Sequence, residues 1–283
     1  MSSRTETAPS RAGRSWIADA FLAIAIAGAV VPVLWLIVLA LQPQRVIISR
    51  GWNFEFSLSN FEALLEPGQP YAAQLLNSVV IVGGTVAICL AVGAVSGYAL
   101  SQLAVPRSVA RLLLALAGFI AVVPPMTLVP GLYVTLDQLG LLGTLGGLVL
   151  LNAVFQLPFS VLLMRVYFDA VPADIAEAAR VDGAGDVRTL WSVMIPIVRP
   201  GLATVAVFTA IMAWNDFLFG LTMTSGGTTA PLTVGISSLV QPYETSWGEM
   251  AGIGAVAALP LIVLIVVANR HIVSGLTGGA VKG

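Results

Sequence analysis

The chain has 283 residues, 58% of them hydrophobic and 10% charged, with a formal net charge of -1 and a mean hydropathy of +0.95. Because soluble domains carry roughly 25% charged residues, this composition indicates an integral membrane protein. The only lysine is Lys282 and the only histidine is His271, which excludes a Walker A phosphate loop, a histidine-rich metal site and an internal Ser-His-Asp triad. The single cysteine, Cys89, lies in an apolar run and is expected to be a small core residue.

Six apolar runs approach or exceed the roughly 20 residues that a helix needs to cross the hydrocarbon core. They lack the strict alternation and short length of barrel strands, so the sequence predicts an all-α integral membrane fold. The six predicted helices cover residues 17–41, 74–103, 110–133, 146–168, 202–224 and 250–270. The resulting segments are a tail over 1–16, the first helix, an outer loop over 42–73, a core of five helices over 74–270 and a tail over 271–283.

The distribution of basic residues predicts the orientation of the chain. If the N-terminus is cytoplasmic, only Arg45 and Arg50 lie in outer segments, and the other eleven of the thirteen Lys and Arg residues lie inside. Cytoplasmic loops of membrane proteins carry such an excess of basic residues. We therefore expect both termini and the loop over 169–201 to lie in the cytoplasm.

Two further segments carry less specific signals. The outer loop over 42–73 is the longest outer segment, and it either caps the bundle, contacts a partner or is a solvated connection. The third predicted span contains Pro124, Pro125 and Pro130, and proline kinks membrane helices where neighbouring groups satisfy the freed carbonyls. Packing explains most such residues, although broken helices also suit a protein that opens to two sides in turn.

The loop from Pro172 to Leu202 is polar in an apolar chain, and residues 165–200 hold nine of the 27 charged side chains. Pro172 suits the first turn of a helix, and Asp174 and Glu177 place negative charge near its positive end. Gly183 is suited to end this helix after about ten residues.

A second helix is predicted from Asp186 through Trp191, capped by Asp186 and ending near Pro196. On the first helix, three small or apolar side chains fall on one side at helical spacing, and we expect this face to let another protein approach closely. These residues are Ile175, Ala178 and Ala179.

Four short patterns in this loop resemble the EAA loop of the permease subunits of bacterial ABC importers. The patterns are Glu177-Ala178-Ala179, Asp182-Gly183-Ala184, Ile195-Pro196 and Pro200-Gly201-Leu202. The resemblance extends to Asn77-Ser78, Tyr98-Ala99-Leu100, Leu139-Gly140-Leu141 with Thr144, Trp214-Asn215-Asp216-Phe217 and the tail over 275–283. Together these patterns are similar to the smaller permease subunit of the maltose-type carbohydrate importers. Many family members have a second Glu at the position of Ala176 and a Leu at that of Ile195, and neither departure is expected to abolish docking.

The resemblance implies a type I ABC importer permease fold in a bacterial cytoplasmic membrane. It also implies a transport subunit without catalysis or cofactor of its own, since ATP and Mg would be bound by a partner ATPase. The implied partners are a second permease, an ATPase dimer, an extracytoplasmic solute-binding protein and membrane lipid, with no nucleic acid. The residues implied in ATPase coupling are Glu177, Ala178, Ala179, Arg180, Asp182, Gly183, Ala184, Pro196 and Gly201.

Asp216 is the only acidic residue well inside a predicted span, which makes it a candidate for the translocation path. The adjacent Trp214 and Asn215 supply an aromatic face and an amide suited to a sugar ring and its hydroxyls. Alternatively, Asp216 and Asn215 fasten helices together. Asn152 and Gln156, four residues apart on one helix face, are weaker candidates for the same path.

The carbohydrate assignment follows from the resemblance, and related importers carry glycerol phosphates and phosphodiesters. The predicted spans contain no buried cluster of Arg or Lys of the kind that an anion would favour, so a neutral disaccharide or oligosaccharide is preferred. An ion-coupled secondary transporter remains an alternative, although such proteins usually show internal repeats and more ionisable residues within the membrane. A membrane-embedded enzyme is the most distant alternative.

Overall fold

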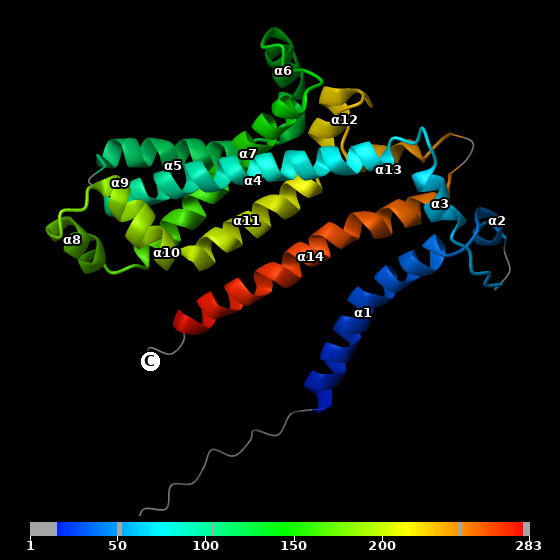
Figure 1. Ribbon diagram of the computed structural model, residues 1–283, viewed down its shortest axis with the longest axis horizontal. Coiled ribbons are helices and arrows are strands. Elements are labelled where there is room, and N and C mark those ends of the chain that lie inside the picture. Colours follow the sequence, from blue (N-terminus) through cyan, green and yellow to red (C-terminus); the bar gives the residue numbers. More distant parts are fainter. Residues whose placement is uncertain (1–15, 50–52, 104, 243–244, 280–283) are drawn as a thin grey trace, which may run out of the picture.

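The computed structural model describes residues 16–49, 53–103, 105–242 and 245–279 (Figure 1). Regular structure in these residues is helical, apart from an isolated antiparallel bridge between Val240 and Thr245. The helices are α1 (Trp16–Ala40), α2 (Gln44–Ile47), α3 (Ser59–Leu65), α4 (Tyr71–Gln102), α5 (Arg107–Val122), α6 (Pro125–Gln138), α7 (Leu145–Asp169), α8 (Ala173–Val181), α9 (Asp186–Thr189), a π-helical turn η1 (Leu190–Met194), α10 (Ile195–Ile197), α11 (Arg199–Trp214), α12 (Leu218–Thr224), α13 (Leu232–Ser238) and α14 (Trp247–Gly279). Of the predicted tail over 1–16, residues 1–15 lie outside the described residues, and Trp16 is the first residue of α1.

The centre of the molecule is the pair α4 and α7, which run in parallel and pack along much of their length (Figure 1). Glycines on α4 allow this close approach. A Cβ at Gly93 would lie 3.3 Å from Ser160 Cβ, and a Cβ at Gly97 would lie 2.8 Å from Met164 Cβ. Small residues are enriched at such membrane helix contacts because they let backbones approach. Helix α11 packs on both α4 and α7, α14 packs on α11, and α1 packs on α14.

Four helices are long and apolar enough to cross a membrane, namely α1, α4, α7 and α14. They correspond to the first, second, fourth and sixth predicted spans. The last of them continues to Gly279, so residues 271–279 are helical where the sequence predicted a tail. Two helix pairs are sharply bent, and counting each pair as one span raises the number of spans in the described residues to six.

The third predicted span, over 110–133, is not one continuous helix. Helix α5 ends at Val122, α6 starts at Pro125, and the two helix axes differ by 102°. Val123 and Pro124 between them have extended backbone angles. The two consecutive prolines have no N–H to continue the α5 hydrogen-bond ladder, which explains a break that is sharper than the predicted kink.

The fifth predicted span, over 202–224, is also divided. Helix α11 starts at Arg199 after a bend of 79° from the preceding helical segment, and it ends at Trp214. A three-residue break precedes α12, and no proline lies in it. The break is instead fixed by hydrogen bonds of Asp216, one tertiary and one local: Thr233 Oγ1 of α13 donates to its carbonyl at 2.8 Å, and Phe219 N in the first turn of α12 donates to its carboxylate at 3.3 Å.

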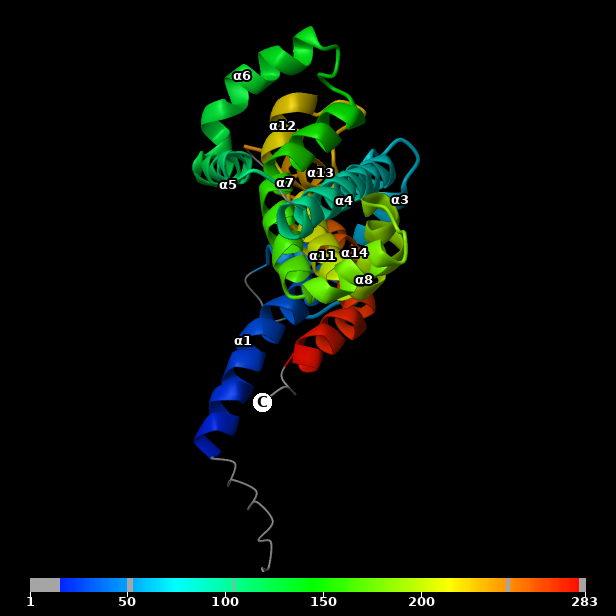
Figure 2. The ribbon, with the colours of Figure 1, turned by 90° about the vertical axis from the view of Figure 1, so that its left-hand side faces the viewer.

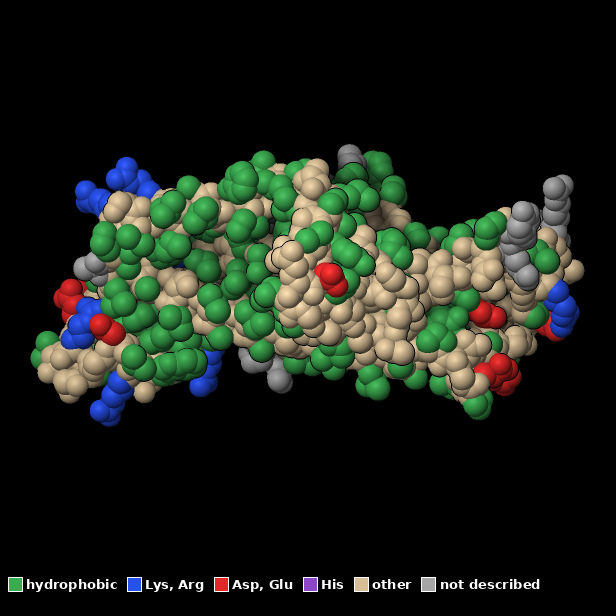
Figure 3. Space-filling model, turned by 90° about the horizontal axis from the view of Figure 1, so that it is seen from above, with side chains coloured by type: hydrophobic (Ala, Val, Ile, Leu, Met, Phe, Trp, Pro, Cys, Tyr) green, Lys and Arg blue, Asp and Glu red, His purple; other side chains and the backbone are tan. Residues whose placement is uncertain are grey.

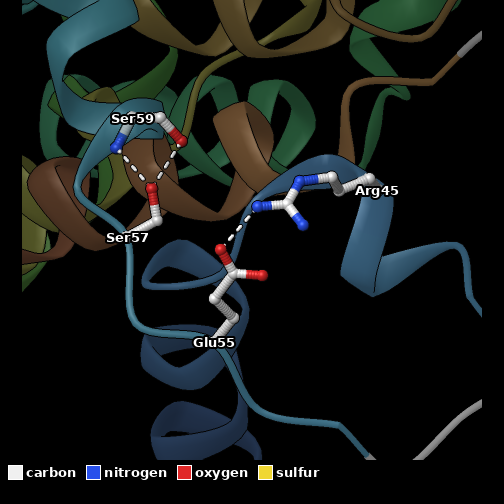
Figure 4. A network of polar contacts seen from close by, with 4 residues as sticks. All are labelled: Arg45, Glu55, Ser57 and Ser59. Carbon is white, nitrogen blue, oxygen red and sulfur yellow. Dashed lines mark hydrogen bonds and ion pairs between the residues drawn. The ribbon is translucent and has the colours of Figure 1, made fainter.

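The segment over 42–73 caps one end of the bundle, because α3 packs on α4 and α14. The buried Asn60 Nδ2 donates to the carbonyls of Ala40 and Gln42, at 2.9 and 2.8 Å. Around it, Arg45 pairs with Glu55 in an exposed ion pair (Figure 4). We call this extremity the α3 end and the opposite one, which carries α8 and α9, the α8 end (Figure 1).

The described basic residues are unevenly divided between these two ends. Among those whose side chains the structure describes, Arg45 lies at the α3 end, while the others lie on helices or helix termini near the α8 end: Arg107, Arg111, Arg165, Arg180, Arg188 and Arg199. In Figure 3, the blue Lys and Arg side chains on the visible face lie toward the two extremities, with a largely uncharged surface between them. This is the charge pattern of a bundle whose middle lies in lipid.

Candidate functional site

Helix α8 forms as its sequence predicts. It begins directly after Pro172, whose φ of -55 suits the start of a helix. Beyond its last turn Gly183 has a φ of +83, a conformation that side chains with a Cβ rarely adopt. Ala184 N then donates to Ala179 O at 2.9 Å, which satisfies one of the last carbonyls of the helix.

The second loop helix differs from the prediction in its cap. The N-cap residue of α9 is Gly185, with no side-chain cap, and Asp186 is the first helical residue. The predicted capping role of Asp186 is therefore wrong, and its Oδ1 instead accepts a hydrogen bond from Arg180 Nε at 3.2 Å. The helical path runs from Asp186 through η1 and α10 to Ile197, which confirms the predicted end near Pro196.

Helical spacing alone predicted one contact face on α8 for another protein, whereas the structure turns part of this face toward the chain's own bundle. Ala176 and Ala179 are buried, at 1% and 9% exposed, whereas Ala178 is exposed. Ala176 belongs to the same core cluster as Met194, and Ile175 is partly buried against it. The small alanine side therefore seats α8 on its own bundle, and Ala178 faces away from it.

Three large apolar side chains are exposed at this polar end of the molecule. Val181 is 87% exposed, Val187 73% and Trp191 57%, and they come from α8, α9 and η1. Together with the exposed Glu177 and Ala178 they define what we call the α8 surface. Exposed apolar groups rimmed by charge at a water-facing end are typical of protein interaction sites.

Arg180 connects this surface to the long helices. Besides its ion pair with Asp186, its Nη2 donates to the carbonyl of Gln102 at 3.2 Å, at the end of α4. The Gln102 side chain in turn donates from Nε2 to the carbonyl of Phe168, near the end of α7, at 3.0 Å. Displacement of α8 would thus shift the ends of both α4 and α7. Sequence reasoning missed Gln102, since no local pattern links positions 78 residues apart.

A polar recess of about 440 Å³ lies beside these contacts, between α8 and the ends of α4 and α7. Its lining includes Gln102, Asp169, Glu177 and Arg180. The Asp169 carboxylate is paired with Arg165, at 3.4 Å from Nε. Glu177 therefore presents a carboxylate at the recess without an ion pair to any residue that the structure describes.

The remaining motif residues shape the two ends of the loop. Asp182 is exposed at the C-cap of α8, Ala184 is partly buried, and Pro196 is exposed on α10. Gly201 is buried in the first turn of α11, where the ring of Tyr167 lies against its bare Cα. A Cβ there would lie 2.6 Å from Cδ2 of that ring. This motif glycine thus has a packing role at the junction of α7 and α11.

Of the residues predicted for a translocation path, the structure brings Asn152 and Asp216 together. The Asn152 side chain is 4% exposed, and its Nδ2 donates to Asp216 Oδ2 at 3.3 Å and to Leu148 O at 3.1 Å. With the Phe219 and Thr233 contacts, these bonds tie the break between α11 and α12 to α7 and α13. The geometry therefore favours the helix-fastening alternative for Asp216.

The other three residues point in different directions. Trp214 is 8% exposed and borders an apolar groove formed with α4 and α14, which includes Gly83 and Pro260. Asn215 is exposed, and its Nδ2 donates to Ile211 O of its own helix at 2.7 Å. Gln156 is partly buried, and its Oε1 has no partner among the residues that the structure describes. Trp214 and Asn215 therefore do not form one binding face.

The chain matches the family described as the binding-protein-dependent transport system inner membrane component over residues 90–275. It is 33% identical to the trehalose transport system permease protein SugB of Mycobacterium tuberculosis over 258 residues, covering 90% of this chain and 93% of that protein. It is 28% identical to the trehalose/maltose transport system permease protein MalG of Thermococcus litoralis, over 89% of this chain and 91% of that one.

Identity with the diacetylchitobiose uptake system permease protein NgcG of Streptomyces coelicolor is 30%, over 89% of this chain and 84% of that one. The fold also matches a solved structure of a bacterial ABC transporter involved in the import of the acidic polysaccharide alginate. The TM-score is 0.77 at 22% sequence identity, over 90% of this chain and 94% of that one. The helical bundle thus has a type I importer permease fold, and the chain belongs to the inner membrane components of binding-protein-dependent transport systems.

Proposed function

We propose that this chain is a non-catalytic permease subunit of an ATP-driven importer, which forms half of the path of a sugar across the bacterial cytoplasmic membrane. Its partners are a second, different permease, a dimer of cytoplasmic ATPases and an extracytoplasmic solute-binding protein. ATP and Mg are bound by the ATPases, and the α8 surface is where one of them docks. Both termini and the α8 end lie in the cytoplasm.

The α8 surface is the observation that carries this proposal. Val181, Val187 and Trp191 expose apolar area beside the free carboxylate of Glu177, at an end that lies outside the apolar middle of the bundle. An apolar centre beside a charged rim is the usual anatomy of a protein interface. The contacts of Arg180 with α9 and α4 give the docked surface a rigid connection to the spans.

The charge distribution supports a cytoplasmic α8 end. Six of the described arginines lie near that end, against Arg45 alone at the α3 end among the described residues. The positive-inside tendency of membrane proteins then favours the α8 end as the cytoplasmic one. This is also the side on which an ATPase finds ATP.

A neutral sugar is the cargo that the relatives and the charges favour. The relatives' names specify trehalose, trehalose or maltose, and diacetylchitobiose. The described arginines lie near the ends of the bundle and none lies at its centre, so this chain offers no interior cation for a glycerol phosphate. Only Asp216 supplies an interior carboxylate among the described side chains, and it is used in fastening helices, which disfavours an ion-coupled carrier.

Co-purification of the tagged chain from its host tests the proposal. The wild-type chain is expected to retain an ATPase and a second permease, whereas Glu177→Lys loses the ATPase and keeps the second permease, because only the α8 surface is altered. Glu62→Lys is the matched control: it reverses an exposed charge on α3, at the other end, and should retain both partners. Retention of the ATPase by Glu177→Lys at the wild-type ratio, or its loss in both variants, contradicts docking at α8.

A further inference from the structure

The surface between α7 and α11 has a side-chain composition unlike that of a lipid-facing helix pair. Along it lie two amides, two phenyl rings and two hydroxyl groups: Gln156, Phe159 and Tyr167 of α7, and Thr204, Phe208 and Asn215 at α11. We call this set the α7–α11 seam. Each of its side chains is exposed or only partly buried in this chain.

Contacts between the two helices join four of these residues, in two pairs, in a strip along the seam. Tyr167 Oη and Thr204 Oγ1 are hydrogen-bonded at 3.1 Å near the α8 end. Further along, the rings of Phe159 and Phe208 are stacked with centroids 4.0 Å apart and planes 28° apart. The Asn152–Asp216 hydrogen bond closes the strip at the break after α11.

The strip lies at membrane depth. Gln156 is eleven residues from Leu145 and thirteen from Asp169, so it sits near the middle of α7. A helix of 25 residues is about 37 Å long at about 1.5 Å per residue, close to the thickness of a bilayer. Polar side chains at this depth do not face hydrocarbon, which cannot hydrogen-bond them. Gln156 Oε1 is buried without a partner among the described residues, whereas the exposed Asn215 amide requires water, cargo or another protein.

Two other helix contacts flank the seam. Helix α5 packs on α7, and α14, which carries α1, packs on α11. Viewed from the α8 end, α5 lies to one side of α7, and α14 and α1 lie beyond α11 (Figure 2). The seam carries aromatic faces and uncharged hydrogen-bonding groups, a lining suited to a ring with apolar faces and hydroxyl edges.

We infer that the α7–α11 seam is the wall that this chain contributes to the cargo path, with the Phe159–Phe208 pair as a stacking platform for a neutral sugar ring. This inference rests on the proposed function, and it replaces the predicted cluster of Trp214, Asn215 and Asp216. Trp214 is turned toward α4 and α14, and Asp216 fastens helices. Of the predicted residues, Gln156 and Asn215 line the path.

Accessibility to water in the assembled transporter tests the inference without knowledge of the cargo. Cys89 is fully buried and is replaced by Ser, and single cysteines are introduced at Gln156, Phe208 and Asn215 along the seam. Membrane vesicles with the full complex are treated with the membrane-impermeant thiol reagent methanethiosulfonate ethyltrimethylammonium. Val95→Cys on α4 and Val263→Cys on α14 are the controls, since they are 50% and 60% exposed in this chain and lie on apolar faces.

The seam cysteines are expected to react at least tenfold faster than the two controls. Equal labelling rates at seam and control positions overturn the inference. Unreactive seam cysteines also overturn it, because another protein segment or lipid would then cover the seam. Labelling does not depend on transport, so ATP-dependent uptake of radiolabelled trehalose by the Cys89→Ser complex is measured separately. If the complex takes up trehalose in an ATP-dependent way but the seam cysteines do not react, this inference alone is refuted. If the seam cysteines react but uptake does not depend on ATP, the proposed function alone is refuted.

Discussion

Replacing Gly201 with Ala should destabilise the protein, because the ring of Tyr167 occupies the space where the new Cβ would go. The Cβ would lie 2.6 Å from Cδ2 and 2.8 Å from Cδ1, whereas carbon atoms in ordinary contact are about 3.5–4.0 Å apart. The ring must therefore move by about 1 Å, which breaks its 3.1 Å hydrogen bond with Thr204.

Overpacking of this kind costs about 1–3 kcal/mol. The lost hydrogen bond adds about 1 kcal/mol, and the better helix propensity of Ala recovers about 1 kcal/mol. The net expectation for Gly201→Ala is thus a loss of about 1–3 kcal/mol. Gly118→Ala on α5 is the matched control, since a Cβ there meets nothing within 4 Å; it should be neutral or slightly stabilising.

The assay is the apparent midpoint of thermal unfolding of the purified protein in detergent, compared at one heating rate because membrane proteins often unfold irreversibly. Gly201→Ala should melt below wild type and Gly118→Ala should not. In a double-mutant cycle, adding Gly201→Ala to Tyr167→Ala should cost little, since the clashing ring is gone. Equal midpoints for Gly201→Ala and Gly118→Ala, or a full additional loss in the double variant, would refute the packing argument.

Three other substitutions test separate contacts. Asn60→Ala should lower the same midpoint by removing the donor to two buried carbonyls, a cost of about 1–3 kcal/mol; an unchanged midpoint would contradict this role. Asp216→Asn should lower the free energy of unfolding by about 1–3 kcal/mol. The carboxylate accepts two hydrogen bonds, and in Asn an NH2 group replaces one oxygen and faces one of the two N–H donors. A gain in stability would contradict the helix-fastening role. Arg180→Ala should cost at most about 1 kcal/mol of stability, as exposed ion pairs do, yet reduce ATP-driven uptake. The exchange Arg180→Asp with Asp186→Arg restores the ion pair but not the donor to the Gln102 carbonyl, so full recovery of uptake would show that the bond to α4 is dispensable.

The sequence predicted best what local rules determine. The long apolar runs of α1, α4, α7 and α14 could be assigned from length alone, and the end of α8 followed from Gly183, whose φ of +83 requires a residue without Cβ. The break in the third span had a local cause as well, because Pro124 and Pro125 lie at it. Only its angle of 102° exceeded the expectation.

Features set by distant contacts could not be predicted. The break after Trp214 contains no proline and depends on partners of Asp216 on α7 and α13. Helical spacing showed which α8 residues share a side, but only packing on the rest of the bundle, as in the cluster that holds Ala176 and Met194, decided which side turns inward. The same limit explains why the Phe159–Phe208 pair, 49 positions apart, gave no signal.

The central claim is that ATP hydrolysis by a cytoplasmic ATPase, docked on the α8 surface, drives transport through this chain. The most direct test is uptake of radiolabelled trehalose into proteoliposomes that hold the purified complex, with binding protein outside and ATP inside. The account predicts uptake that requires internal ATP, persists when ionophores collapse all ion gradients, and is lost in Glu177→Lys while that variant remains in the membrane. Uptake that proceeds without ATP and stops with the ion gradients, or that is normal in Glu177→Lys, would contradict it.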